Sequence, residues 1–326
     1  MGLLSLARRR HNAILTALLV FPLLSCTVQA QPPEFGSRVD RGLVENDEIN
    51  EASGIAASRR NPGVLWTHND SGDSTRIFAV GRNGEDLGDF FLSGTSARDW
   101  EDIAVGPGPE ANISYIYVGE IGDNNAQYPT KRIYRVAEPE VDQNAEPSAH
   151  TLEDVETITF AYPDGPRDAE ALMVDPVTRD IYIVSKREES VRVYRAAYPQ
   201  STTETITLEH VTTLEGLTFI TAGDISSDGG NILLKDYQTV FYWERKGGES
   251  IAEAFARTPF NPPYTLEPQG EGIAWDADES GYFTLSEEPQ GIEAHLYFYP
   301  QLNVSSVNGE KAEGTTEKRL NLTEGQ

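Results

Sequence analysis

Short apolar runs alternate with polar turns along most of the chain. Examples of such runs are Val64–Thr67, Tyr115–Val118, Ile181–Val184 and Tyr282–Leu285, and Gly, Asp, Asn and Pro punctuate the segments between them. No stretch with apolar residues at the three-and-four spacing of an amphipathic helix stands out. Short runs bounded by turn residues are typical of β-strands. The pattern therefore predicts an all-β protein.

A six-residue pattern recurs five times without gaps. Each copy opens a longer repeat. In that repeat the polar start leads into a first apolar run, which is followed by a second apolar run, a turn and a third run that contains aromatic residues. The starts lie 48, 69, 53 and 48 residues apart. This period is typical of a β-propeller blade of four antiparallel strands. The copies begin at Glu51, Asp99, Asp168, Thr221 and Gln269.

Five copies predict five blades, and a degenerate sixth blade could hide in the long second repeat, which contains a polar insertion from Glu138 to Asp154. The fifth repeat runs out after its third strand, near Pro300, whereas a lone strand-like segment, residues 37–44, precedes the first repeat. We therefore expect this N-terminal strand to complete the last blade and close the ring. The alternative fold is a sandwich of two sheets, but a sandwich does not explain why an acidic first-strand start recurs at the spacing of a blade.

Both ends of the chain are expected to lie outside the propeller. Three arginines precede an apolar run that ends at Leu24, which is the order of a secretory signal. The four residues ending at Cys26 resemble a bacterial lipobox, and cleavage after Ala30 is the rival possibility. We expect an exported protein, secreted or held at a bacterial cell envelope by a lipid on Cys26. The predicted plan is a signal peptide (1–26), a linker (27–36), a propeller (37–304) and a disordered polar tail (305–326).

The charge balance narrows the possible partners. Lys and Arg total 26 against 52 Asp and Glu, so the formal net charge is −26. Such a protein repels phosphate backbones, which argues against a nucleic-acid binder and leaves cations as favoured partners. Cys26 is the only cysteine, so the mature chain has no internal disulfide. We expect a monomer.

Acidic residues recur in aligned columns at the starts of the first strands. In a propeller these starts and the ends of the second strands meet at one mouth of the axis, so up to eight carboxylates would ring that mouth. Their repulsion costs several kcal/mol unless protons, cationic side chains or a metal neutralise them. Oxygen ligands without Cys or clustered His favour a hard cation, Ca²⁺ before Mg²⁺ or Mn²⁺. Alternatively, these residues point into the blades and cap strand ends. The predicted metal ligands are Glu101, Asp102, Glu170, Asp224 and Glu271.

The ends of the second strands supply a further column at the same mouth, whose members we expect to contact a ligand: Asn69, Glu120, Lys186, Asp236 and Glu287. Glu120 and Glu287 are the candidate catalytic residues, because a carboxylate beside a metal can activate water. The third strands open with cations, among them Arg132 and Arg192, which suit an anionic ligand or, alternatively, balance neighbouring acids. His68 is a candidate general base or a structural histidine.

Two loops follow second strands on the same face. The Asp, Asn and Gly content of Asp70–Asp73 and Gly122–Asn125 suits either calcium ligation or a tight turn. Neither loop has the twelve residues and terminal Glu of an EF-hand. The chain also has no Gly-x-Ser-x-Gly, P-loop, paired-His zinc or dinucleotide glycine motif.

Parts of the repeat resemble known families. Asp168–Pro176 and Ile121–Asn125 resemble segments of secreted bacterial propeller proteins of uncharacterised function, and Gln269–Ala274 is similar to segments of phytase-like and gluconolactonase-like propellers. The resemblance implies a propeller with a calcium or other divalent ion near its axis. The complete catalytic patterns of those enzymes are not found in this chain.

Three functions are consistent with the sequence. The first is an exported propeller that binds a divalent cation and, at its acidic mouth, a small-molecule or protein ligand. The second is a metal-dependent hydrolase of a phosphate ester or lactone. The third is a purely structural surface protein.

Overall fold

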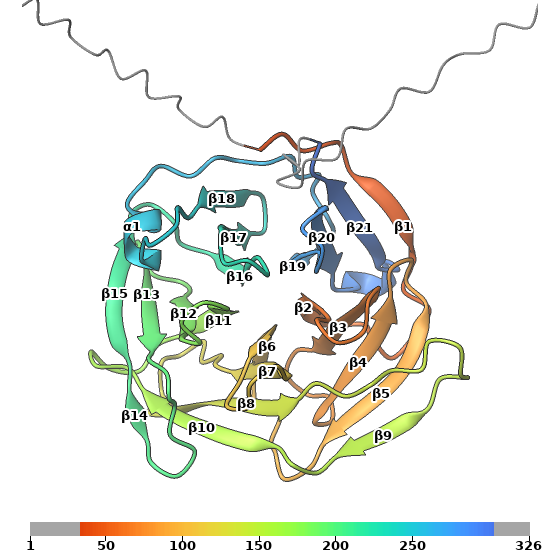
Figure 1. Cartoon of the computed structure of the whole chain (residues 1–326), viewed down its shortest axis with the longest axis horizontal. Coiled ribbons are helices and arrows are strands. Elements are labelled where there is room, and N and C mark those ends of the chain that lie inside the picture. Colours follow the sequence, from red (N-terminus) through yellow and green to blue (C-terminus); the bar gives the residue numbers. More distant parts are fainter. Residues whose placement is uncertain (1–32, 303–326) are drawn as a thin grey trace, which may run out of the picture. The chain divides into compact units, whose positions relative to one another are not determined.

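The computed structural model describes residues 33–302, which form five small sheets around a central axis (Figure 1). The first strand of each sheet is innermost and contacts the first strands of both neighbouring sheets. The protein is therefore a five-bladed β-propeller, as the repeat predicts. The predicted signal peptide, most of the linker and the C-terminal tail lie outside the described residues. Within residues 33–302, no helix is long and apolar enough to cross a membrane.

The strands of each blade follow one another outward from the axis. Blade 1 contains β2 (Ala52–Ala57), β3 (Val64–Asn69), β4 (Arg76–Gly81) and β5 (Asp86–Leu92), and blade 2 contains β6 (Trp100–Pro107), β7 (Ser114–Glu120), β8 (Lys131–Ala137) and β10 (Glu156–Ala161). Blade 3 contains β11 (Ala169–Val174), β12 (Ile181–Ser185), β13 (Val191–Ala196) and β15 (Glu209–Leu214), and blade 4 contains β16 (Ile220–Ile225), β17 (Asn231–Asp236) and β18 (Val240–Glu244). Blade 5 contains β19 (Gly270–Trp275), β20 (Gly281–Ser286), β21 (His295–Pro300) and β1 (Val39–Leu43).

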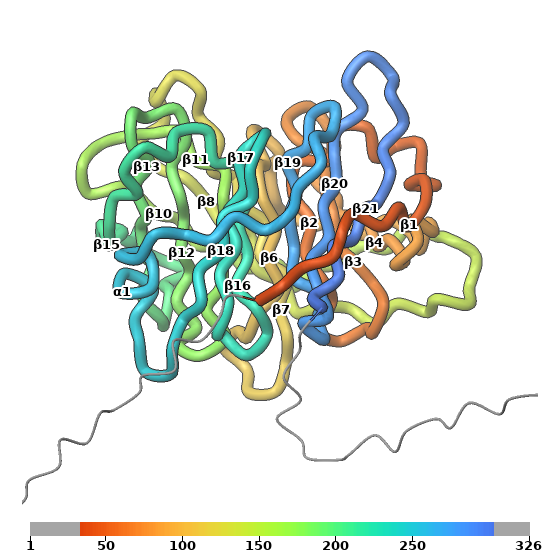
Figure 2. The backbone as a smooth tube through the Cα atoms, turned by 90° about the horizontal axis from the view of Figure 1, so that it is seen from above, coloured from red at the N-terminus to blue at the C-terminus, as the bar shows by residue number. Residues whose placement is uncertain are grey.

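The N-terminal strand closes the ring, as expected. β1 pairs antiparallel with β21, with Val39 opposite Phe298 and Leu43 opposite His295. Figure 2 shows the two strands side by side although they come from opposite ends of the described chain. The folded contacts begin before β1, since Phe35 is buried and packs edge-on against Tyr282. Residues from both ends of the propeller thus share one blade.

Three features depart from a regular four-stranded blade. The polar insertion in the second repeat is not a sixth blade, because its strand β9 (Ala149–Leu152) adds in parallel to β5 of blade 1. A two-residue strand, β14 (Ile206–Thr207), adds in the same way to β10 of blade 2. Blade 4 has three strands, and at its outer edge Phe260 forms a single bridge with Tyr242. The short helix α1 (Ile251–Phe255) lies in the chain between β18 and this bridge.

The cores lie between neighbouring blades. Trp66 of blade 1 packs in one cluster with Trp100 and Tyr134 of blade 2, and all three are buried. Trp275 of blade 5 likewise joins a cluster with Tyr242 of blade 4. The apolar side chains are buried between the blades. The polar side chains described below lie instead at the ends of the innermost strands.

Candidate metal site at the mouth of the axis

A β-bulge occurs at the same place in all five innermost strands. In each blade the pairing between the first and second strands skips one residue near the start of the first strand. A bulge leaves its extra residue unpaired and redirects that side chain. All five first strands begin at one end of the axis, which we call the mouth. The bulge residues there are Ser53, Glu101, Glu170, Thr221 and Glu271, all of them buried.

The bulges revise the predicted alignment of blade 4. The gap-free repeat places Gly223 and Asp224 in the acidic columns, but the observed pairing places Thr221 at the bulge. Blade 4 is therefore offset by two residues and contributes a hydroxyl where Glu101 and Glu170 contribute carboxylates. The Asp-Ile dipeptide at Asp224 matches the one at Asp102, and this match led to the wrong alignment of blade 4. The register of a strand is set by its pairing with the neighbouring strand and not by such a local match.

Asp102 and Asp224, two predicted metal ligands, bind backbone amides instead. Asp102 accepts hydrogen bonds from the N–H groups of Leu172 (2.9 Å) and Gly223 (3.3 Å), and Asp224 accepts one from Trp275 (2.8 Å). Each aspartate also caps the amide of the residue that follows it. Both carboxylates therefore tie their own blade to a neighbouring inner strand. They do not join the groups of acids described next.

Glu101 belongs to two groups of three carboxylates. One ligand oxygen from each of Glu101, Asp168 and Glu170 lies within 4.8 Å of the other two, and the same holds for Glu101, Asp70 and Asp99. Asp99 and Asp168 come just before β6 and β11, and Asp70 directly follows β3. The five acids thus come from blades 1, 2 and 3. We call them the acidic cluster.

In the described part of the chain the Glu101 carboxylate makes no direct contact with a donor or cation, although the charge of Lys186 acts on it from a distance. Its side chain is 4% exposed, and within residues 33–302 no donor or cation forms a hydrogen bond or ion pair with it. Gly122 approaches so closely that a Cβ atom there would clash with the carboxylates of Glu101 and Asp99. A buried carboxylate without a donor is costly unless it is protonated or bound to a metal.

The pKa values of several carboxyl groups in the acidic cluster are raised, as expected for buried carboxylates close to one another. Burial and the neighbouring carboxylates raise the pKa of Glu101 well above its usual range. Burial raises the pKa of Glu170 to about 8 although the charge of Lys186 opposes it. Burial also raises the pKa of Asp70, to about 6, and that of Asp99. A cation among these oxygens would relieve both the burial cost and the repulsion.

Hydrogen-bond donors and cationic side chains flank the acidic cluster. Lys186 directly follows β12, and its ammonium forms an ion pair with Glu170 and donates a hydrogen bond to the Tyr237 hydroxyl (2.9 Å). Tyr237 donates in turn to Glu271 (2.8 Å). Glu271, another predicted ligand, therefore has a donor, unlike Glu101. Arg187 lies 3.3 Å from a carboxylate oxygen of Asp168.

The two predicted catalytic residues occupy different environments. Glu120 is fully buried and accepts hydrogen bonds from Ser96 (2.6 Å), Tyr134 (2.8 Å) and Arg132 (3.0 Å), so its carboxylate is committed within blade 2. Glu287 lies at the mouth, where Gln269 donates to it. Burial and the charge of Glu271 raise the pKa of Glu287 to about 8.

The other predicted ligand-binding residues are held in local contacts. Asn69 accepts from the Glu51 amide (3.1 Å), and Asp236 accepts from the amides of Gln238 and Thr239 in the turn that follows it. Arg192 pairs with Asp164 (2.5 Å), and Arg132 pairs with Glu120 as described above. Charge balance, the alternative weighed from the sequence, accounts for both arginines.

His68 and the two loops also have defined roles. The His68 ring is completely buried against Trp100, and burial lowers its pKa to about 4, so it is not placed to act as a base at the mouth. In the second loop the Asp123 carboxylate accepts from the amides of Gln127 and Tyr128 and pairs with Lys131 (2.6 Å). That loop is a tight turn, whereas the first loop contributes Asp70 to the acidic cluster.

The sequence-based selection of ligands missed four residues of the mouth. Asp70, Asp99 and Asp168 were visible in the aligned columns and loops but were not selected. Tyr237 directly follows Asp236, the residue predicted from blade 4, and the observed pairing gives Tyr237 the position that Lys186 and Glu287 hold in their blades.

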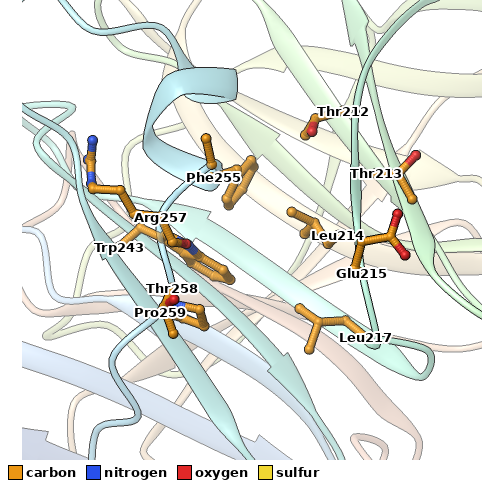
Figure 3. Close-up of a pocket in the computed structure, with 11 residues that line it drawn as sticks. Thr212, Thr213, Leu214, Glu215, Leu217, Trp243, Phe255, Arg257, Thr258 and Pro259 are labelled. Carbon is orange, nitrogen blue, oxygen red and sulfur yellow. The ribbon is translucent and has the colours of Figure 1, made fainter.

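A cavity away from the mouth has no comparable chemistry. It has a volume of about 390 Å³ and lies beside the three-stranded blade 4, lined by β15, Trp243, Phe255 and the segment after α1 (Figure 3). Its charged groups are already paired, since Glu215 accepts from Ser190 and Arg257 forms an ion pair with Glu249. The acidic cluster is thus the stronger candidate for a functional site.

Comparison of the chain with protein-family models and with curated proteins found no match in either set. The function must therefore be inferred from the site itself.

We predict that the chelated protein becomes less stable as the pH rises from 5 to 9. Glu170 and Glu287 have pKa values raised from 4.5 to about 8, so the folded state holds protons that the unfolded chain releases. This contribution to stability is complete below about pH 4.5 and is lost as the pH rises through about 8. Melting curves in excess chelator measure the effect, and a Glu287→Gln variant should show a shallower decline. A melting temperature that rises across this range would contradict the prediction.

Proposed function

We propose that this propeller binds a hard divalent cation at its mouth and, through that cation, an oxygen-bearing ligand. The observation that supports this most directly is Glu101, a buried carboxylate without a donor at the junction of two groups of acids. Lys186 pairs with Glu170 and Arg187 with Asp168, which leaves Glu101, Asp70 and Asp99 for an ion.

Calcium is the first candidate for the ion. The cluster offers carboxylate oxygens only, without sulfur or imidazole, which favours hard cations. Five acids on three separate blades supply more oxygens than an octahedral magnesium ion normally takes from protein, whereas calcium accepts six to eight. Asp70 and Asp99 are half-buried, so they face the side from which water or a ligand would reach the ion.

Calcium titration of chelator-treated protein tests the proposal. An ion bound only by the folded state stabilises it by about 2.7 kcal/mol at a hundredfold excess over its dissociation constant, so the melting temperature should rise with calcium. Magnesium and manganese titrations rank the ions. An unchanged melting temperature at millimolar concentrations of all three would reject the metal site.

A metal-dependent hydrolase is the second candidate, and one observation favours it. Lys186 and Tyr237 place an ammonium and a hydroxyl beside the acidic cluster, where they could hold an anionic oxygen of an ester. Of the two predicted bases, Glu287 is the one at the mouth. Assays of calcium-loaded protein with a phosphomonoester, a phosphodiester and a lactone separate the candidates. Turnover that disappears in Glu287→Gln favours the hydrolase, and saturated but inactive protein favours the binding module.

We further propose that the protein acts after export, either free or anchored through Cys26. Millimolar calcium is ordinary outside cells, where a site of modest affinity is filled. Metabolic labelling with a fatty acid, compared between the full chain and a Cys26→Ser variant, distinguishes the anchored form from the free one.

A further inference from the structure

A second cavity lies at the far end of the axis, where the first strands end. It has a volume of about 450 Å³, within the range of small-molecule sites. Its floor is formed by three buried apolar residues near the last positions of β6, β11 and β16, and its walls are half-buried. The floor is Val105, Val174 and Ile225, and the walls include Pro107, Ile113 and Pro176.

Arg59 lines this cavity and has no ion-pair partner. It lies two residues beyond β2, and within residues 33–302 its guanidinium forms no hydrogen bond and no ion pair, with Nη1 buried. The backbone N–H of Arg59 is anchored to the buried carboxylate of Glu138 (3.3 Å). By contrast, its neighbour Arg60 pairs with Glu140 (3.2 Å). An unpaired arginine is notable in a chain with twice as many acidic as basic residues.

Asp224 is an acid on which the Arg59 charge acts, but it does not pair with Arg59. Burial raises the pKa of Asp224 to about 6, and the positive charge of Arg59 opposes that rise. The two side chains therefore interact electrostatically. The two groups form no ion pair, and the Asp224 oxygens accept the amides of Ile225 and Trp275. The guanidinium therefore retains donors for an external anion.

We propose that this cavity binds a small organic anion with an apolar body, such as a medium-chain carboxylate, with Arg59 holding the anionic group. The apolar floor would take the body of the ligand, and the planar guanidinium suits a carboxylate or sulfonate. This site is separate from the proposed metal site, because the first strands begin at the acidic cluster and end at this cavity. Its ligand class also differs from the cation bound at the mouth.

The dye 8-anilinonaphthalene-1-sulfonate tests the proposal, since it combines an apolar ring system with one sulfonate. We expect saturable fluorescence at one dye per folded chain, displaced by octanoate. Arg59→Met should weaken binding about tenfold, as expected for loss of one charge-assisted hydrogen bond, whereas the matched control Arg60→Met should leave it unchanged. Ile113→Asp, which places a like charge in the wall, should also weaken it.

Two further measurements keep the test decisive. Circular dichroism confirms that each variant is folded, because the dye also binds unfolded chains. The affinity should be the same in chelator and in calcium, so a failed metal site would leave this result intact. No saturable binding by the folded wild type, or equal affinities for Arg59→Met and Arg60→Met, would overturn the proposal.

Discussion

Replacing Glu101 by Gln is expected to abolish the calcium-induced rise in melting temperature. Glu101 is the one residue shared by both groups of the acidic cluster, so its loss removes a charged ligand from each. Calcium affinity depends on the number of charged ligands, and we expect a weakening of about a hundredfold or more. Gln keeps the size of the side chain. Without metal the variant should melt at or above the wild type, most clearly at high pH, because a buried carboxylate has been removed.

Glu271→Gln is the matched control. Glu271 occupies the same bulge position in its blade and is equally buried, but Tyr237 donates to it and it belongs to neither group of acids. A Gln side chain can still accept that hydrogen bond. The control should keep most of the calcium response. Equal loss of response in both variants would show that the whole ring, and not the acidic cluster, holds the ion.

Replacing Glu138 by Ala is expected to destabilise the fold by about 4 kcal/mol, because several buried donors lose their acceptor at once. Its carboxylate is 1% exposed and accepts from the Trp66 indole (2.8 Å) and the Arg60 amide (3.0 Å). Three further donors reach it: the Ser58 and Ser114 hydroxyls and the Arg59 amide. Glu138 thus ties blade 2 to blade 1. Urea unfolding measures the loss.

Glu140→Ala provides the comparison two residues away. Glu140 is largely exposed and makes one ion pair with Arg60, so its removal should cost less than about 0.5 kcal/mol. If the two variants unfold at the same urea concentration, the Glu138 carboxylate is not the tie between blades that its contacts indicate.

The blades themselves were predictable from the sequence because they are local. Each repeat carries its own strands and turns, and the spacing between repeats is the length of one blade. The missing last strand of the fifth repeat and the lone strand at residues 37–44 likewise indicated closure between β1 and β21. An acidic mouth also followed from the pattern, since all first strands begin at the same end of the axis.

The sequence could not determine which acids meet. Glu101 and Asp102 are adjacent and equally acidic, yet one lies in the acidic cluster and the other binds the amides of Leu172 and Gly223. The β-bulge at Glu101 makes the Glu101 and Asp102 side chains point in different directions. The pairing of β6 with β7 determines where that bulge lies. The first strand of blade 4 is offset by two residues from the predicted alignment for the same reason, so Asp224 is kept from the mouth.

Burial was equally beyond the sequence. Glu138 begins a segment that reads as a polar insertion, but the neighbouring blade encloses it with donors. Arg59 and Arg60 are identical in type and consecutive, yet of the two only Arg60 forms an ion pair within residues 33–302. The sequence by itself therefore determined the repeated strands, because each repeat is formed by residues close together in the chain, and it indicated the closure of the ring through the unpaired strand left at each end of the repeats. The tertiary structure alone decided the ligands and the ion pairs, because strand register, bulges and burial are set by contacts between blades.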